Sequence, residues 1–582
     1  MTKLKVALAF SLAVLCCIGL TSVRSISSDN PTTNAPVQFD KLVDEYFNFY
    51  FEFHPTEATA AGFHQYDGKL EDFSRSAVDA EVVKLKALQS RFDLLDPAKL
   101  APMSAGDLEL LKSTIKSRLL ELDTIRMWRK DPDLCTSGVT RSIYLIIKRD
   151  FAPPEVRLRS VIAREGAIPA AIVAARQNLE NPPKIYTEIA LEQMPGMIDF
   201  FRKDVPGAFA EVKDAQLVAE FQRSNAAVID ALRKYQIFLR DDLLPISKGD
   251  FRIGAENYRK KLLDDEMVDI PLDRLQEMGY ADLRRNQQRL KETAEQIDPK
   301  HSPREVLAEL GKDHPTPDHL LQSFRDILGS LRQFIEQKQI VSIPSQVLPI
   351  VQETPPFMRA TTTASMDIPG AYETKATEAL LSVTLPQPGW KPQRREEWME
   401  GFNRGTILST AIHEAYPGHY TQFLWVQHAP SKVRKLIAVG TNAEGWAHYC
   451  EQMMLDEGYG GGDPKLRLGQ LQDALLRDAR FIVGIEMHTG HMTLEQAREF
   501  FIREGYQTPP IAEVESKRGS GDPTYLVYTL GKLQILKLRD DFKKKEDGNF
   551  TLKDFHDRFM GQGVVPLKLL RKALLGDDSP TL

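Results

Sequence analysis

The stretch ILSTAIHEAYPGHYTQF, residues 407–423, carries most of the information about this chain of 582 residues. It opens like the helix of a zinc peptidase, in which H-E-x-x-H places two histidines four residues apart on one helical face. Here His419 follows His413 by six residues, with Pro417 and Gly418 between them. At about 100° per residue, a regular helix would point these two histidines roughly 240° apart.

The Pro-Gly pair between the histidines offers a way to bring them together. Pro417 cannot donate a hydrogen bond to the carbonyl of His413, and its ring disrupts that turn. Gly418 tolerates backbone angles that other residues avoid. We therefore expect a helix that is kinked or bulged between His413 and His419. The alternative is a chance His-Glu pair followed by an ordinary helix end.

A hydrolytic zinc site also needs a third ligand and a carboxylate that takes a proton from water. Glu414 can be that base. In the later segment TNAEGWAHYCEQMM, Glu444, His448 and Glu451 repeat at spacings of four and three, so they share one helical face. Glu444 can reach a metal bound by His413 while the other two support the ligands. The alternative is a glutamate that forms a solvated surface pair.

Helical periodicity dominates the rest of the chain. Apolar residues at spacings of three and four mark residues 39–51 and, further on, roughly 75–97, 104–128, 153–180, 208–243 and 271–297. Between about 339 and 393, β-branched residues and prolines replace this pattern and predict short strands. The prolines of this region suit edge strands. If the segment ALLSVTL lay at a sheet edge, its backbone could pair with an extended peptide; the favoured alternative is an ordinary structural strand.

Composition excludes some classes of function. The 75 lysines and arginines are outnumbered by 81 aspartates and glutamates, which gives a net charge of −6 without any block of like charges. Nucleic acid is therefore not an expected partner, because binding it needs a concentrated basic surface. The sequence has neither a phosphate-binding glycine loop with its lysine nor a G-x-S-x-G elbow.

The N-terminus has the features of an export signal. Lys3 and Lys5 precede an apolar run over residues 6–20, which is too short to span a bilayer. We expect a signal peptide over residues 1–25, a linker over 26–36 and one mainly helical catalytic unit over 37–582.

Export would place the protein in the periplasm or outside the cell. Lipidation is not expected, because neither Cys16 nor Cys17 follows a small residue. No later segment is apolar enough to form a transmembrane helix. Of the other two cysteines, Cys135 and Cys450, the sequence leaves open whether they pair. It also leaves the oligomeric state open.

Two motifs together resemble a known family. HEAYPGHYTQ and AEGWAHYCEQ look like the signature pair of the domain of unknown function 885 family. FHPTEATAAGFHQYDGKL resembles its N-terminal pattern, and DPTYLVYTLGKLQILKLR and FTLKDFHDRFMGQGVVPLKLL resemble its C-terminal ones, so the similarity runs along most of the chain.

That family is placed with the zincin-like metallopeptidases. The resemblance implies a mainly α, zincin-like helical metallohydrolase with a small β-sheet next to the active-site helix. It further implies one Zn2+ per chain, held by His413, His419 and Glu444, with Glu414 as general base. His448 is a weaker ligand candidate than Glu444, since its position varies in the family.

Four further residues are candidates for the pocket. Tyr528 and His488 could help to stabilise the oxyanion formed in amide hydrolysis. Arg518 and Arg539 could bind a substrate carboxylate in bidentate fashion, which would favour exopeptidase action. The alternatives are a core aromatic for Tyr528, a helix C-terminal cation for His488 and surface ion pairs for the two arginines.

The leading hypothesis is an exported, zinc-dependent metallopeptidase that hydrolyses short peptides. A second hypothesis keeps the metal but places the reaction at a different amide or ester, such as a cell-wall substrate. A third is a non-catalytic helical binding protein with a structural metal, which would have no use for Glu414 as a base.

Overall fold

The structure is a computed structural model that describes residues 35–359 and 362–582. The predicted signal peptide over residues 1–25, the question of lipidation and most of the predicted linker lie outside the described residues. The first helix begins at Ala35, so it includes the last two residues of the predicted linker.

Helices make up most of the fold. In the first part of the chain they are Ala35–Phe53 (α1), Pro55–Ala61 (α2), Arg75–Asp93 (α3), Pro102–Leu119 (α4), Met127–Lys130 (α5), Asp133–Ile147 (α6), Pro154–Asn178 (α7), Lys184–Asp199 (α8), Val205–Ala208 (α9), Ala215–Ile237 (α10), Gly254–Glu266 (α11), Leu272–Ile297 (α12), Pro303–Gly311 (α13) and Pro317–Lys338 (α14). After the strands Ile350–Glu353 (β1), Ala364–Asp367 (β2) and Leu380–Val383 (β3) come Pro392–Glu400 (α15), Arg404–Glu414 (α16), His419–Val426 (α17), Lys432–Leu436 (α18), Gly440–Asp456 (α19), Pro464–Thr489 (α20), Leu494–Arg503 (α21), Pro509–Gly521 (α22), Val527–Glu546 (α23), Leu552–Met560 (α24) and Leu567–Leu575 (α25).

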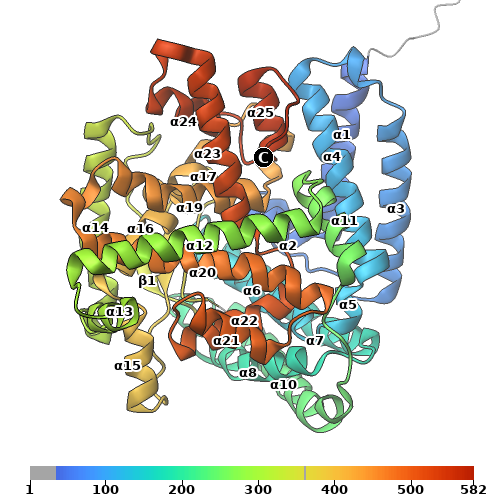
Figure 1. Cartoon of the computed structure of the whole chain (residues 1–582). Coiled ribbons are helices and arrows are strands. Elements are labelled where there is room, and N and C mark those ends of the chain that lie inside the picture. Colours follow the sequence, from blue (N-terminus) through green and yellow to red (C-terminus); the bar gives the residue numbers. More distant parts are fainter. Residues whose placement is uncertain (1–34, 360–361) are drawn as a thin grey trace, which may run out of the picture.

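The prediction of a mainly α fold with a small sheet is confirmed. Each predicted apolar stripe corresponds to a helix, because burying such a stripe against neighbours stabilises the helix that carries it. The largest hydrophobic core contains side chains from Phe39 in α1 to Leu574 in α25. The long helices α12 and α20 pack along each other across the middle of the molecule (Figure 1).

The sheet differs from the prediction in one respect. Its strand order is β1-β3-β2, with β3 parallel to β1 and antiparallel to β2. The segment ALLSVTL forms β3, so it is the central strand and its backbone is paired on both sides. This arrangement excludes an edge role for the segment and confirms the alternative of an ordinary structural strand. All four residues of β3 are buried, as is typical of a strand enclosed by neighbours.

The two cysteines of the described part of the chain are both free. Cys135 in α6 and Cys450 in α19 are not joined by a disulfide, and each is buried.

No helix among the described residues combines the length and the apolar character that crossing a bilayer requires.

A close contact between two glycines sets the distance between α19 and α23. A Cβ atom at Gly445 would lie 2.5 Å from Cα of Gly531, and a Cβ at Gly531 would lie 1.8 Å from the carbonyl oxygen of Thr441. Neither position has room for a side chain. The two helices therefore approach each other at backbone distance, next to Glu444 and one turn after Tyr528.

We predict that Gly531→Ala destabilises the protein by about 1–3 kcal/mol or more, because the added methyl group forces α19 and α23 apart. Chemical denaturation would measure this. The control is Gly329→Ala in α14, where a Cβ meets no atom within 4 Å. That change should stabilise by about 0.5–1 kcal/mol through helix propensity. Equal stability of the Gly531 variant and the wild type would contradict the close-packing interpretation.

Candidate metal centre

The helix α16 presents the His-Glu pair in its last turn. It begins after Asn403, whose side-chain oxygen accepts hydrogen bonds from the backbone amides of Gly405 (3.0 Å) and Thr406 (3.1 Å). This N-cap satisfies amides that would otherwise lack partners in a buried position. The helix ends at Glu414, so His413 and Glu414 both lie at its C-terminal end.

The chain between the histidines is a true break and not a kinked helix. The structure has two helices, α16 and α17, separated by residues 415–418, with a cis peptide bond before Pro417. The prediction of a single kinked or bulged helix was therefore wrong. The expected result, that His413 and His419 come together, is nevertheless observed. The amide of Gly418 donates to the carbonyl of Ile412 at 3.0 Å and closes the turn.

Gly418 is needed here for space. Its φ is −68°, within the range that other residues adopt. A Cβ atom at this position, however, would lie 1.9 Å from the carbonyl oxygen of His413. The backbone can fold back over the end of α16 only because Gly418 has no side chain.

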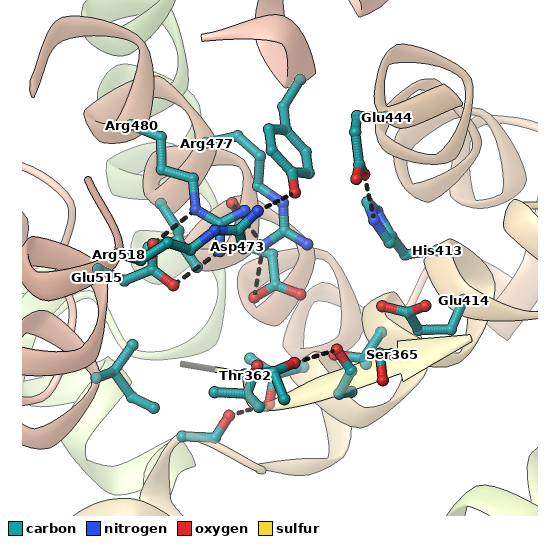
Figure 2. Close-up of a pocket in the computed structure, with 18 of the residues that line it drawn as sticks. Thr362, Ser365, His413, Glu414, Glu444, Asp473, Arg477, Arg480, Glu515 and Arg518 are labelled. Atoms are coloured by element: carbon teal, nitrogen blue, oxygen red, sulfur yellow. Dashed lines mark hydrogen bonds and ion pairs between the residues drawn. The ribbon is translucent and has the colours of Figure 1, made fainter. Parts of the chain in front are cut away.

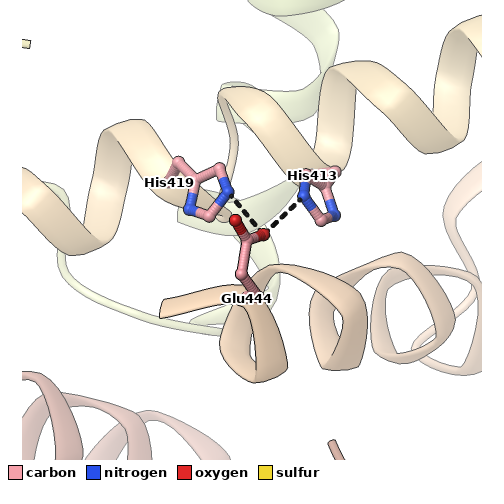
Figure 3. Close-up of side chains that lie close together, drawn as sticks. All are labelled: His413, His419 and Glu444. Carbon is pink, nitrogen blue, oxygen red and sulfur yellow. Dashed lines mark hydrogen bonds and ion pairs between the residues drawn. The ribbon is translucent and has the colours of Figure 1, made fainter. Parts of the chain in front are cut away.

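This fold-back brings three side chains from three helices together (Figure 3). Oε2 of Glu444, on α19, lies 3.3 Å from Nε2 of His413 and 3.2 Å from Nε2 of His419. Within the described residues, these are the side chains that could hold a metal ion, with ligand atoms all within 4.8 Å of one another.

The donor set and its spacing fit zinc. Two imidazoles and one carboxylate are a known zinc ligand set that leaves a fourth position open. In a tetrahedral site with bond lengths of about 2.0–2.2 Å, neighbouring ligand atoms are about 3.3 Å apart. The separations between Glu444 and the two histidines match that value.

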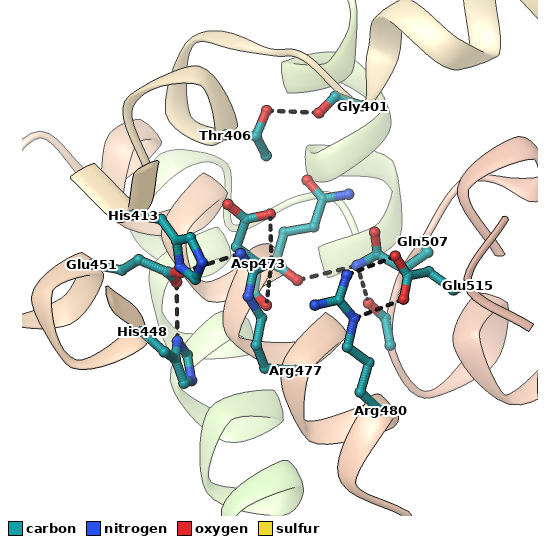
Figure 4. A network of polar contacts seen from close by, with 12 residues as sticks. Gly401, Thr406, His413, His448, Glu451, Asp473, Arg477, Arg480, Gln507 and Glu515 are labelled. Carbon is teal, nitrogen blue, oxygen red and sulfur yellow. Dashed lines mark hydrogen bonds and ion pairs between the residues drawn. The ribbon is translucent and has the colours of Figure 1, made fainter. Parts of the chain in front are cut away.

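Glu451 fixes the orientation of His413 from behind (Figure 4). Nδ1 of His413 donates to Oε1 of Glu451 at 2.7 Å, which leaves Nε2 directed at Glu444. Glu451 is fully buried and also contacts His448 (3.1 Å) and Arg477 (3.2 Å). Glu451 therefore orients the candidate ligand His413. His448 contacts Glu451 and is not part of the candidate ligand set.

The local charges favour a cation between the ligands. Burial lowers the pKa of His413, but the carboxylates of Glu444 and Glu451 outweigh it and raise the pKa to about 9. Burial raises the pKa of Glu444, yet the two histidines hold it well below its usual range. Both carboxylates therefore remain ionised at neutral pH, ready to balance a positive ion.

A cavity of about 450 Å³ opens beside the three ligands (Figure 2). Its walls come from residues 362–366 around β2 and from helices α16, α19, α20, α22 and α23. Glu414 lines this cavity and is 8% exposed. A carboxylate next to the metal position and facing the cavity is placed as a general base requires.

Tyr528 and Arg518 line the same cavity. The ring of Tyr528 lies 6.1 Å from that of His413, and Arg518 donates to the Tyr528 hydroxyl oxygen at 2.9 Å. Because an arginine can only donate, the hydroxyl hydrogen of Tyr528 is left free for another acceptor. Burial raises the pKa of Tyr528 to about 12, so the hydroxyl keeps its proton at neutral pH.

Comparison with known proteins decides the family. Residues 55–574 match the family described as "Bacterial protein of unknown function (DUF885)". The chain belongs to this family. No curated protein matches it significantly.

Two solved structures are similar over nearly the whole DUF885 chain. One is a "putative lipoprotein of unknown function" from Shewanella oneidensis, with 27% identity, a TM-score of 0.75, and coverage of 93% of this chain and 99% of that one. The other is a "putative lipoprotein" from Colwellia psychrerythraea, with 17% identity, a TM-score of 0.78 and the same coverage.

Two residues predicted for the pocket lie elsewhere in this DUF885 protein. His488 does not line the cavity; it is buried at the end of α20, and its Nε2 donates to the carbonyl of Gly519 at 2.8 Å. Burial lowers its pKa to about 4, so it is not a helix C-terminal cation either. Arg539 lies three turns beyond Tyr528 on α23 and donates to the Tyr449 hydroxyl at 3.2 Å. Both predictions were wrong because sequence does not show which face of these helices meets the cavity.

Sequence reasoning missed the charged face of α20. Asp473, Arg477 and Arg480 repeat at spacings of four and three and line the cavity. Arg480 forms a bidentate pair with Glu515 of α22, with both distances 2.7 Å. The signal was present in QDALLRDAR, because a charged stripe on an otherwise apolar helix indicates buried polar chemistry.

We predict about one zinc per chain in the purified protein and its loss in His413→Ala and Glu444→Ala, because each variant removes a ligand. Glu451→Gln should keep the site but weaken zinc affinity about 10- to 100-fold, since His413 loses its oriented partner. Metal analysis and competition with a chelator would measure both effects. Glu457→Gln, an exposed change on the same segment, is the control. Unchanged zinc content in Glu444→Ala would rule out this ligand set.

Proposed function

We propose that this DUF885 protein is a zinc-dependent metallopeptidase that hydrolyses short peptides. The observation that carries the proposal is the convergence of His413, His419 and Glu444 beside a cavity that Glu414 also lines. A structural zinc site is normally closed by four protein ligands, whereas this set offers three.

Glu414 would act as the general base. When bound, the zinc ion would polarise the scissile carbonyl and make a water molecule more acidic. Glu414 takes the proton from the attacking water and then donates it to the leaving amine. Its place next to His413 in the last turn of α16 keeps its carboxylate within the cavity.

Tyr528 would donate a hydrogen bond to the oxyanion that forms in the reaction. Its hydroxyl keeps its proton at neutral pH, and Arg518 holds the oxygen from the other side. Such a preorganised donor stabilises charge that develops only in the transition state. Arg518 lines both this cavity and its neighbour and also pairs with Asp522 at 3.6 Å. It could hold a substrate carboxylate, as an exopeptidase needs.

The strand β2 would hold the peptide backbone. Among the described residues it pairs with β3 alone, so its other edge is free, and residues 362–366 line the metal cavity. An extended peptide can add to such an edge through backbone hydrogen bonds. A second cavity of about 600 Å³ shares Thr362, Met366 and Arg518 with the first, which gives a longer peptide room beyond the metal centre.

Export is part of the proposal. The N-terminal sequence has the charge and apolar pattern of a signal peptide. The two similar structures are described as putative lipoproteins, which are exported proteins. Because of those relatives, whether this chain is lipidated is a question for mass spectrometry of the mature N-terminus.

An amide or ester hydrolase acting on a non-peptide substrate would use the same residues. A free strand edge beside the cavity favours a peptide over such substrates. Glu414, facing the cavity, favours catalysis over a purely structural metal.

We predict that Glu414→Gln lowers peptide hydrolysis about 100- to 10,000-fold while zinc content stays unchanged, because the base is removed and the ligands are not. A library of short peptides, analysed by mass spectrometry, would give the substrates, and Glu457→Gln would serve as the matched control. Full activity in Glu414→Gln would exclude it as the base. Absence of peptide hydrolysis by zinc-loaded wild type would overturn the peptidase proposal.

We also predict that Tyr528→Phe lowers kcat about 100-fold or more with little change in KM, because the hydroxyl acts on the transition state. Steady-state kinetics on the best peptide would test this. A change confined to KM would instead assign Tyr528 to ground-state binding.

A further inference from the structure

One acidic side chain in the metal cavity lacks a full set of partners. Asp473 is 9% exposed and lines the cavity one turn before Arg477 on α20. Its Oδ1 lies 3.6 Å from Arg477, beyond hydrogen-bond distance. Its Oδ2 is buried and has no hydrogen-bond partner among the described residues.

The neighbouring arginines are engaged elsewhere. Arg477 contacts the buried carboxylate of Glu451 at 3.2 Å, and Arg480 is held by both oxygens of Glu515. Arg477 therefore divides its charge between Glu451 and Asp473, and Arg480 is paired with Glu515, so Asp473 is only partly neutralised. Burial accordingly raises the pKa of Asp473 to about 6, even though Arg477 acts against the shift. At neutral pH Asp473 is mostly an ionised, incompletely paired carboxylate.

Besides Arg477, uncharged polar side chains surround Asp473, among them Ser409, whose hydroxyl acts with Arg477 to lower the pKa of Asp473. Thr406 and Thr410 of α16, Gln472 of α20 and Thr508 before α22 also line the cavity. The hydroxyl oxygen of Thr508 is also buried without a hydrogen-bond partner. The unpartnered oxygen of Asp473 can accept a hydrogen bond from a donor group that enters the cavity.

A primary ammonium is the group that fits this acceptor. It carries three donors and one positive charge, so it would satisfy the free oxygen of Asp473 and balance its charge. A neutral amide or hydroxyl would supply hydrogen bonds but no charge.

We propose that Asp473 binds an ammonium group of the substrate, so that the metal cavity selects peptides with a free amine. This inference rests on the proposed peptidase function and narrows its substrate class. The amine can come from the peptide's amino terminus or from a lysine side chain, which share the same chemistry. Asp473 is then a specificity residue, and Glu414 and Tyr528 act on the scissile bond.

Binding can be tested without turnover. The probes are leucyl-leucinamide and its N-acetylated form, titrated calorimetrically into zinc-loaded Glu414→Gln protein, with and without Asp473→Asn. We expect Asp473→Asn to weaken binding of the free amine about 10- to 100-fold, the range for a charge-assisted hydrogen bond. Binding of the acetylated probe should change less than about threefold. N-acetyl-lysinamide distinguishes the source: Asp473-dependent binding of this probe would assign the site to a side-chain amine.

Two controls keep the result specific. Asp540→Asn makes the same chemical change on the exposed side of α23 and should leave both affinities unchanged. Zinc content of Asp473→Asn must equal that of the parent, because a purely structural role through Arg477 and Glu451 would disturb His413.

If Asp473→Asn weakens binding of both probes equally, the proposal is overturned and Asp473 is assigned to positioning Arg477. If neither affinity changes, the proposal is likewise overturned and Asp473 has no part in binding the probes. The outcome is separable from the peptidase proposal. Selective amine binding without peptide hydrolysis by the wild type would refute only the peptidase activity. Peptide hydrolysis that does not distinguish free from acetylated amino termini or lysine side chains would refute only the role of Asp473.

Discussion

His413 and His419 can converge on Glu444 only because the helix that carries the His-Glu pair stops at Glu414. A continuous helix would turn the second histidine away from the first. The chain instead folds back over the end of α16, with Gly418 against the His413 carbonyl, and starts a new helix at His419. The position of α19, which carries Glu444, depends in turn on its glycine contact with α23. Two places where a side chain is sterically excluded thus determine the ligand geometry.

The three candidate ligands lie next to charged groups whose burial costs free energy. Glu451 and Arg477 lie in the interior, where an unpaired charge would destabilise the fold by several kcal/mol. His448 beside them is neutral, because burial lowers its pKa to about 4. Pairing lowers that penalty, because Glu451 contacts His413, His448 and Arg477 together. A hydrophobic core of the same shape would be a simpler way to stabilise the fold. The retention of these groups next to three ligand atoms is therefore consistent with a functional role.

The polar side chains of the cavity differ in how completely their charges and hydrogen bonds are paired. Arg480 and Glu515 neutralise each other, and Arg518 supports the Tyr528 hydroxyl. Glu414 and Asp473 are the acidic groups left facing the cavity beside the ligand set. Their different surroundings suit different tasks. Glu414 follows the candidate ligand His413 at the end of α16, whereas Asp473 lies on the facing helix α20. The free edge of β2 adds backbone groups to this wall.

The sequence by itself determined the helical class and the approximate helix positions, and it predicted the candidate set His413, Glu414, His419 and Glu444, which the structure brings together. Apolar periodicity and motif spacing are local properties, so they can be read without knowing how the helices pack. The sequence could not determine that Pro417 and Gly418 separate two helices or that ALLSVTL is a central strand. Nor could it determine that His488 and Arg539 lie outside the cavity lining. Only the tertiary structure decided these points, together with the cavity face of α20 that carries Asp473. The physical reason is that a helix with polar groups on several faces does not reveal which face will be covered by which neighbour.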